Sequence, residues 1–285
     1  MELKVNSITF IIVCFKSENV IFSCLNSLPK NSKKIVIENS NNIKLKEQIE
    51  LKYDNIEVLM NDNLGMGASN NVGILRSNTE FVYILNPDTK FNENTFDKLV
   101  EAVNNIDDFA IISPLCSNHK FPNYKILKKQ FPDNDQILEV DSIDGFSMLI
   151  NKKKFNNFFD ENIFLYLEND DICLRAKKNR EKIYIIKNSL IDHLGASSSN
   201  IKNTYDFEYL RNWHWMWSKF YFKRKHYGYL NALISGFPKF LSSILKFLFY
   251  MILRKQYKRE IYFNRSLGFL NALLGRKSTY RPKLD

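Results

Sequence analysis

The sequence has few glycines (9), prolines (7) and cysteines (4) among its 285 residues. The glycines form neither G-x-G-x-x-G nor G-x-x-x-x-G-K, which excludes a dinucleotide-binding fingerprint and a Walker loop. The cysteines form no C-x-x-C pair and no cluster with histidine at metal-ligand spacing: Cys14, Cys24, Cys116 and Cys173. We therefore expect neither a zinc module nor a disulfide framework, and we expect a reducing cytoplasm as the compartment.

Long hydrophobic runs are also missing. The apolar run in the N-terminal stretch MELKVNSITFIIVCF has only about eight residues and no small-residue cleavage site, so we interpret it as a first strand rather than a signal peptide. In the C-terminal part, Pro238, Lys239 and Lys246 divide the apolar residues into runs shorter than the roughly eighteen that a membrane span needs. A transmembrane helix is therefore not expected there.

Acidic residues are scarce in the last quarter of the chain. The net charge is +10, but residues 211–285 hold 16 Lys or Arg against two acidic residues, a balance of +14, whereas residues 1–210 have a balance of −4. Aromatic and basic residues occur together in this tail, which is typical of a helix in an anionic membrane interface. The alternative is a core-packing or dimerising helix. We predict a domain at 1–210 and a basic, aromatic-rich helical region at 211–285.

Four short apolar segments, separated by stretches of helical length, are present in the first hundred residues: 8–14, 34–37, 56–60 and 81–85. This alternation predicts an α/β fold with a mostly parallel central sheet flanked by helices. Further along, we expect an irregular or hairpin-rich region at about 104–140, a strand led by Gly145, a helix at about 168–179, and a strand followed by a polar, small-residue loop in KIYIIKNSLIDHLGASSS.

Polar residues follow these strands, at the sheet edge where ligands of α/β proteins bind. The stretch NPDT, residues 86–89, places Asp88 after a buried strand. Asp88 is either a turn-forming residue or a ligand of Mg²⁺ or Mn²⁺, because hard cations prefer oxygen ligands. The glycines of NLGMGASNNVGI, residues 63–74, either shape a turn or let the backbone approach a ligand closely.

The order of these motifs resembles glycosyltransferase family 2, in its rhamnosyltransferase-like branch. The resemblance covers roughly residues 7–225 and rests on seven stretches: FIIVCFKSE, IVIENSNN, NDNLGMGASNNVGI, FVYILNPDT, GFSMLI, FDENIFLYLENDDICLRAKKN and HLGASSS. It implies a Rossmann-like GT-A fold and a metal-dependent, inverting transfer of a sugar from a nucleotide-sugar donor.

The resemblance also assigns residues to the donor site. Those it places around the nucleotide-sugar are Phe15, Lys16, Glu38, Asn39, Asn63, Gly65, Gly67, Asn71, Asn86 and Asp88. Asp88 would bind the cation, and Asn86 stands where the family usually has the first acid of D-x-D. His193 matches a histidine that completes the metal site in relatives, although a histidine after a strand is often only a structural hydrogen-bonding residue.

The catalytic base is expected in LENDDI, where the family carries an E-D-x-D-like motif. The aligned residues are Glu168, Asn169, Asp170 and Asp171, so an amide replaces the second acid. An amide cannot accept the proton of the acceptor hydroxyl, which leaves Asp170, or else Glu168, as the base. Asp171 stands four residues before Arg175 and is expected to form a structural pair with it. The alternative to a catalytic role is that these acidic residues only stabilise the start of the helix by interacting with its dipole.

The resemblance extends to partners. It implies a dTDP- or UDP-sugar donor, possible transfer of rhamnose, and a lipid-linked saccharide acceptor in bacterial cell-surface polysaccharide assembly. We expect a cytoplasmic protein, peripheral on the inner face of the cytoplasmic membrane, with no nucleic-acid partner and with homo-oligomerisation left open. Two rivals remain. One is a nucleic-acid-binding protein that uses Trp213, Trp215, Trp217 and Tyr221, and the other is a family member that binds sugar nucleotides without catalysis.

Overall fold

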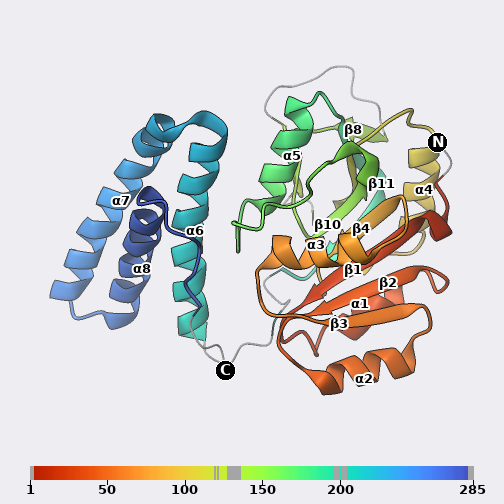
Figure 1. Ribbon diagram of the computed structural model, residues 1–285, viewed down its shortest axis with the longest axis horizontal. Helices are drawn as coiled ribbons and strands as arrows, with labels where there is room; N and C mark the ends of the chain where they lie inside the picture. The colour runs from red at the N-terminus through yellow and green to blue at the C-terminus, as the bar shows by residue number, and fades with distance from the viewer. Residues whose placement is uncertain are drawn as a thin grey trace. The chain divides into compact units, whose positions relative to one another are not determined.

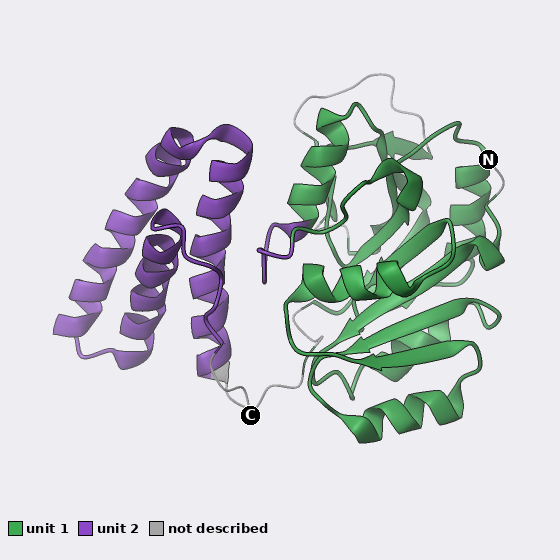
Figure 2. Cartoon of the chain, viewed as in Figure 1, with its two compact units in different colours: residues 1–160, 169–200 green, residues 161–168, 201–285 purple. Residues whose placement is uncertain are grey.

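The computed structural model describes residues 3–118, 120, 122–126, 136–195, 199 and 204–281 (Figure 1). The chain forms two compact units, residues 1–160 with 169–200, and residues 161–168 with 201–285 (Figure 2). The strands are β1 (Ile8–Cys14), β2 (Lys33–Glu38), β3 (Ile56–Met60), β4 (Phe81–Leu85), β5 (Thr89–Phe91), β6 (Ile111–Cys116), β7 (Tyr124–Lys125), β8 (Ile137–Glu139), β9 (Ser142–Ile143), β10 (Ser147–Asn151) and β11 (Ile183–His193). The helices are α1 (Ile21–Ser27), α2 (Ile43–Lys52), α3 (Met66–Arg76), α4 (Thr95–Asn104), α5 (Glu168–Lys178), α6 (Thr204–Tyr227), α7 (Tyr229–Ile252) and α8 (Gln256–Leu273), with short 3₁₀ turns at Val5–Ser7 and Lys152–Lys154.

The first unit is built on a nine-stranded mixed sheet in the order β3-β2-β1-β4-β10-β6-β11-β5, with β8 paired to β11. The four strands predicted from the first hundred residues are confirmed, and they are neighbours. β1 runs parallel to β2 and β4, and β2 runs parallel to β3. Their carboxyl ends therefore share one edge of the sheet, which is where the polar segments of the sequence follow.

Helices cover both faces of this sheet. Successive side chains of a strand point to opposite faces, and β1 divides accordingly. Phe10 and Ile12 lie in an apolar cluster with residues of α1, α2 and α4, whereas Ile11 and Val13 lie in a second cluster with residues of α3 and α5. The predicted α/β class, a sheet flanked by helices, is confirmed.

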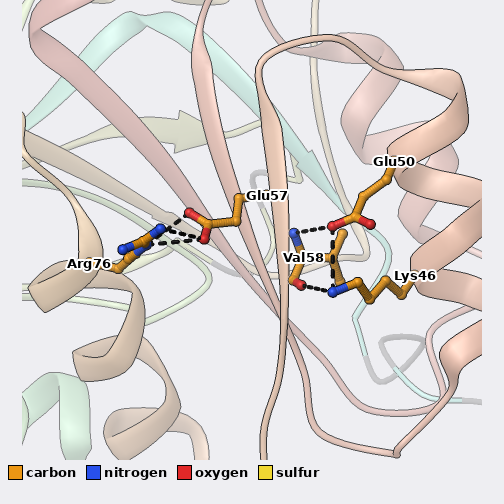
Figure 3. Close-up of polar contacts among 5 residues, drawn as sticks. All are labelled: Lys46, Glu50, Glu57, Val58 and Arg76. Atoms are coloured by element: carbon orange, nitrogen blue, oxygen red, sulfur yellow. Dashed lines mark hydrogen bonds and ion pairs between the residues drawn. The ribbon is translucent and has the colours of Figure 1, made fainter.

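The edge strand β3 is protected by side chains from its neighbouring helices (Figure 3). Glu50 of α2 accepts a hydrogen bond from the Val58 N–H at 3.1 Å, and Lys46 of α2 donates to the Val58 carbonyl at 3.0 Å. Arg76 of α3 holds Glu57 through two nitrogens, with the shortest N–O distance at 2.8 Å. These contacts occupy polar groups that an open sheet edge would otherwise offer to another chain.

One central strand contradicts the sequence-based expectation. Residues 104–140 are expected to be irregular or hairpin-rich, but β6 lies inside the sheet between β10 and β11. Because of Pro114, the sequence of β6 does not look like that of a central strand: proline has no N–H to donate to a neighbouring strand. In the structure Pro114 pairs with Ile186, and the ladder shifts register between Ile186 and Leu190. A local irregularity thus accommodates the proline.

The second unit is a bundle of α6, α7 and α8, which confirms the helical tail. Its buried apolar cluster consists of Trp213, Met216, Trp217, Phe220, Ala232, Phe269 and Ala272. Gly268 lets α8 approach α6 closely, because a Cβ atom there would stand 2.1 Å from the Trp213 carbonyl oxygen. Residue 210, the predicted boundary, lies inside α6, and the compact unit that contains this helix consists of residues 161–168 and 201–285.

Within the described ranges, α7 is the helix that is long and apolar enough to cross a membrane. Its most apolar 18-residue window has a mean hydropathy of 1.4, and only 11% of that window is buried. Pro238 interrupts the apolar run in the sequence but does not interrupt the helix. The tail therefore presents a continuous helix of 24 residues.

Candidate active site

The loops after β1 and β2 are joined through the buried carboxylate of Glu38. This carboxylate accepts hydrogen bonds from the Asn42 N–H at 2.7 Å, from the Ser40 N–H at 3.0 Å and from the Ser40 hydroxyl. The Ser40 hydroxyl oxygen in turn accepts from the Lys16 N–H at 3.2 Å. Glu38 thus fixes the shape of the loop that follows its strand, and its role in reading the nucleobase stays a prediction.

A second set of hydrogen bonds joins the loops after β2 and β3 to the start of α3. Asn39 donates from Nδ2 to the Ser69 hydroxyl oxygen at 2.7 Å, and Asn61 donates to Asn39 Oδ1 at 3.1 Å. Gly65 precedes α3 with φ of 103°, a backbone conformation that favours glycine. The structure therefore brings Asn39 and the loop of Asn63 and Gly65 to the same sheet edge, as the sequence predicted.

Asn71 has a structural bonding pattern. Its side chain donates to the Phe159 carbonyl and accepts from the Phe159 N–H, both at 2.9 Å. These two bonds tie α3 to the segment before α5. Gly67, one turn earlier on α3, is buried. Contact of either residue with a nucleotide-sugar stays a prediction.

Asp88 and His193 meet where β4, β5 and β11 come together. Asp88 is 3% exposed, and its Oδ1 lies 3.5 Å from His193 Nε2. β5 begins one residue after Asp88 and pairs antiparallel with the end of β11, so that Thr89 stands opposite His193. The Leu194 N–H also donates to the Asp88 carbonyl at 3.1 Å. Backbone pairing, and not only side-chain contact, holds the two residues together.

This pair fits a divalent cation that takes two ligands from the protein. Two ligands on one octahedral ion, each at about 2.1 Å, stand about 3 Å apart, close to the separation seen here. Across the described residues, no group of three or more His, Cys, Asp and Glu side chains could hold a metal ion. The remaining ligands would therefore come from water and substrate oxygens, which is usual for Mg²⁺.

The surroundings of the pair hold it in place. The His193 ring stacks on Phe146 with centroids 4.1 Å apart. The Asn86 N–H donates to the Phe146 carbonyl at 2.9 Å, and the Asn86 carbonyl accepts from the Thr89 hydroxyl at 2.7 Å. Beneath this turn lies the Cys24 thiol, whose pKa is raised to about 12, chiefly by burial. That thiol stays protonated and serves packing.

The acidic start of α5 separates into residues with different contacts. Asp170 accepts hydrogen bonds from Lys125 Nζ on both carboxylate oxygens, at 2.8 and 3.1 Å. Asn169 donates from Nδ2 to the Ile143 carbonyl at 2.9 Å, a bond that an ionised carboxylate could not make. Asp171 is fully buried against Arg175 at 2.9 Å, so the expected structural pair is confirmed.

Glu168, the other candidate base, is the first residue of α5. The two residues before it, Tyr166 and Leu167, have φ of 70° and 71°, and such values cost roughly 1–2 kcal/mol per non-glycine residue. The Tyr166 hydroxyl oxygen accepts from Arg211 Nε at 2.7 Å, which helps to hold the turn. Burial raises the pKa of Tyr166, Arg211 opposes that rise and Glu168 adds to it. Glu168 is therefore within electrostatic reach of the Tyr166 hydroxyl.

The comparison with known families decides the broader identity of this site. The family model described as "Glycosyl transferase family 2" matches residues 9–175, more than half of the chain. The chain belongs to glycosyl transferase family 2. The match contains every strand of the candidate site except β11, so Asp88 and the acidic start of α5 lie within it and His193 lies beyond it.

Relatives of this glycosyltransferase agree with that result. The low-salt glycan biosynthesis hexosyltransferase Agl10 of Haloferax volcanii is 26% identical over 212 residues, 67% of each chain. Among solved structures, S. aureus TarS 1-349 is 14% identical, with a TM-score of 0.52 over 94% of this chain and 92% of that chain. The mannosyltransferase PcManGT of Pyrobaculum calidifontis, solved with GDP-Man and Mn²⁺, is 9% identical, with a TM-score of 0.57 over 95% and 88%. The structural likeness shows a GT-A fold.

Two charged residues that the sequence did not single out, Asp144 and Lys125, interact with the candidate residues of this glycosyltransferase. Burial raises the pKa of the Asp144 carboxyl, Asp170 adds to the rise, and Lys125 and His193 oppose it. Asp144 is therefore in electrostatic contact with both the candidate base and the candidate metal ligand. The pairing of β7 with β9 brings Lys125 opposite Ser142, two residues before Asp144. Neither residue belongs to a motif with a recognisable spacing.

Two other features lie outside the site of this family member. A surface hollow of about 300 Å³, lined by Lys4–Asn6 and Pro29–Asn31, lies at the amino ends of β1 and β2, opposite the edge that carries Asp88. In the tail, Trp213 and Trp217 are only 3% and 2% exposed. Both are core residues, so neither offers the open stacking surface that a nucleic-acid-binding tail requires.

Proposed function

We propose that this glycosyltransferase moves a hexose from a nucleoside-diphosphate sugar to a saccharide hydroxyl, with a divalent cation and with inversion at the anomeric carbon. The observation that carries the proposal is the approach of Asp88 and His193 to 3.5 Å at the edge where the loops after β1, β2 and β3 also converge. The complexes of PcManGT with GDP-Man and of TarS with UDP-GlcNAc support the donor class.

In this proposal the loops bind the donor. The backbone of Lys16, ordered by Ser40 and Glu38, and the loop through Asn63 and Gly65 would enclose the nucleotide. Asp88 and His193 would hold Mg²⁺ or Mn²⁺, which when bound neutralises the charge that develops on the departing diphosphate. Asp88 is suited to this role because its backbone is fixed by β5 and its carboxylate faces a histidine.

The acceptor hydroxyl would be deprotonated by one carboxylate at the start of α5. Direct attack on the anomeric carbon needs a single base, unlike the pair of carboxylates in glycosidases, and it inverts the configuration. We favour Asp170, with Glu168 as the second candidate. Both Asp170 oxygens accept hydrogen bonds from Lys125, so the incoming hydroxyl would replace one of these bonds.

The finer identity of donor, acceptor and location is also proposed. The resemblance to the rhamnosyltransferase-like branch favours dTDP-rhamnose, and the names of the relatives add UDP-hexoses and GDP-mannose as candidates. The proposed acceptor is a lipid-linked saccharide in cell-surface polysaccharide assembly, used at the inner face of the cytoplasmic membrane. The hexosyltransferase Agl10, named for glycan biosynthesis, supports a saccharide product.

Thermal unfolding with a panel of sugar nucleotides, with and without Mn²⁺, tests the proposal. A ligand that binds only the folded protein raises its apparent stability, so we expect one donor to stabilise the protein in a Mn²⁺-dependent manner. Asp88→Asn keeps the shape of the side chain, and it should abolish this dependence and lower turnover by about 100-fold or more. Asp54→Asn, in an exposed turn, is the matched control and should behave as wild type.

Unchanged Mn²⁺-dependent stabilisation in Asp88→Asn would contradict the assigned metal site. Binding of a donor with neither hydrolysis nor transfer, over a panel of saccharide acceptors, would instead favour the catalytically inactive alternative. Turnover in the presence of Mn²⁺ removes that alternative.

A further inference from the structure

Helix α7 exposes an apolar stripe that nothing in the described chain covers. Its large side chains recur at helical spacing, and each is between 48% and 77% exposed: Leu230, Ile234, Phe237, Leu241, Leu245 and Ile252. At 3.6 residues per turn these positions fall within an arc of about 80°. Soluble proteins rarely expose a contiguous apolar surface of this length without a partner.

The charges around the stripe are of one sign. No Asp or Glu occurs from residue 209 to residue 259, a range that includes all of α7 and the turn to α8. Arg254 and Lys255, at the C-terminal end of α7, are exposed. Lys246 lies away from the stripe, with its Nζ 5.3 Å from the Tyr262 ring on α8. An apolar stripe with exposed basic residues just beyond its C-terminal end and no acidic residue near it in the sequence complements a surface that is both apolar and anionic.

The opposite face of α7 packs against α8. Rings of the two helices stack in two places, Phe240 on Phe269 at 4.9 Å and Tyr250 on Tyr262 at 5.6 Å. Gly236 permits this approach, because a Cβ atom there would stand 2.6 Å from Phe269 Cε2. For α7 to cross a bilayer, it would have to leave these contacts or take the charged helix α8 with it. The packing therefore favours a helix that lies in the plane of a surface.

A second copy of the chain fits the stripe less well than a lipid surface does. Residues 211–285 carry a balance of +14, so two copies joined through α7 would bring two strongly basic regions together. An anionic bilayer attracts the same charges, at about 1 kcal/mol for each Lys or Arg close to its surface. Hydrophobicity alone would allow either a second copy or a bilayer to cover the stripe, whereas the positive charge favours an anionic bilayer.

We infer that the exposed stripe of α7 is a docking surface for an anionic lipid bilayer, with the helix lying in the interface and its apolar side chains inserted among the lipid chains. The inference rests on the helical unit alone and not on the chemistry of sugar transfer. It specifies which face of the tail meets the lipid and excludes a transmembrane orientation.

Co-sedimentation of the full chain with phosphatidylcholine vesicles, with and without phosphatidylglycerol, tests this surface. We expect preferential binding to the anionic vesicles and release of the bound protein by alkaline carbonate. The double variant Leu241→Glu/Leu245→Glu should lose binding by about tenfold or more, because two apolar side chains no longer insert. The control Leu51→Glu/Leu75→Glu changes two leucines of the other unit that are 92% and 76% exposed, and should bind as wild type.

Several results would overturn the inference. Equal binding of wild type and the α7 variant, with unchanged circular dichroism, would exclude the stripe as the contact. Carbonate-resistant binding would mean that α7 spans the bilayer. If the wild type forms a dimer and does not bind vesicles, and the α7 variant is monomeric, the stripe is the contact between two copies of the chain. Donor-dependent thermal stabilisation, measured on the same variants, reports the proposed function separately, so either proposal can fail without the other.

Discussion

At the scale of single residues, Asn169 determines which acid at the start of α5 can act as the base. Its amide is engaged with the Ile143 carbonyl, which leaves Asp170 and Glu168. We expect Asp170→Asn to lower kcat by about 100-fold or more, because a general base contributes at least that much. Donor affinity should be retained, since Asp170 does not take part in the Asp88–His193 pair. Steady-state kinetics and titration of the nucleotide-sugar measure the two effects.

Glu168→Gln is the comparison for this experiment, because it changes the neighbouring acid on the same helix by the same chemistry. A larger loss of kcat in Glu168→Gln than in Asp170→Asn would move the role of base to Glu168. Lys125→Met is a further control. It frees both Asp170 oxygens, and it should alter kcat without abolishing it if Asp170 accepts the proton.

The sequence singled out candidate residues that follow strands, and it missed charged residues that distant pairing brings beside them. Glu38 ends β2 and Asp88 lies three residues after the end of β4, so parallel pairing predicts that both lie at the carboxyl edge of the sheet. Asp144 and Lys125 lie in a region without periodicity, and the pairing of β7 with β9 alone brings them together. The hydrogen bonds of Glu38 and Asn71 to backbone groups were also beyond prediction, because they depend on side-chain geometry.

At the scale of elements, α6 holds the end of the chain through a histidine that is kept neutral. His214 donates from Nε2 to the Tyr280 carbonyl and accepts at Nδ1 from the Ser278 hydroxyl, at 2.9 and 2.8 Å. Burial lowers the pKa of His214 to about 3. Below the ordinary pKa near 6.5, the unfolded chain takes up a proton that the folded helix does not. Stability contributed by the neutral imidazole is therefore present above about pH 6.5 and lost as pH falls.

We expect the free energy of unfolding of this unit to fall by about 2 kcal/mol between pH 7.5 and pH 5. All three tryptophans lie on α6, so their fluorescence in urea titrations reports this unit selectively. His214→Gln should be less stable at neutral pH but should lose less stability on acidification, whereas His226→Gln on the same helix should keep the wild-type slope. An identical slope in His214→Gln would show that other groups govern the acid response.

Element prediction succeeded where periodicity and burial agreed. The strands β1, β3 and β4 have the bounds expected from their apolar runs, and α5 ends within one residue of its expected end. β6 was not predicted, because Pro114 lacks the N–H that a central strand uses for pairing. In the structure, the pairing of β6 with β10 and β11 outweighs this local penalty. α7 shows the same effect, since packing against α8 keeps the helix continuous through Pro238.

At the scale of the whole molecule, the two units have separate cores, and the charge is uneven along the chain, with a balance of −4 for residues 1–210 and +14 for residues 211–285. We therefore expect two ligands to protect two different sets of amides from hydrogen exchange. A nucleotide-sugar with Mn²⁺ should slow exchange in the loops after β1, β2, β3 and β4, because binding there suppresses local opening. Anionic vesicles should slow exchange in α7 and in the turn at Arg254 and Lys255.

Mass spectrometry of deuterium uptake, resolved by peptide, measures both effects in the same protein. The variant Gly268→Ala serves as the decisive perturbation, because its Cβ would clash with the Trp213 carbonyl and loosen the helical unit. We expect faster exchange throughout α6 and α8 in this variant, and loss of the vesicle effect. Protection by the nucleotide-sugar should remain, since the sheet edge around Asp88 has its own core. Loss of that protection in Gly268→Ala would mean that binding of the sugar nucleotide depends on the helical unit. It would contradict the assignment of the two ligands to separate units.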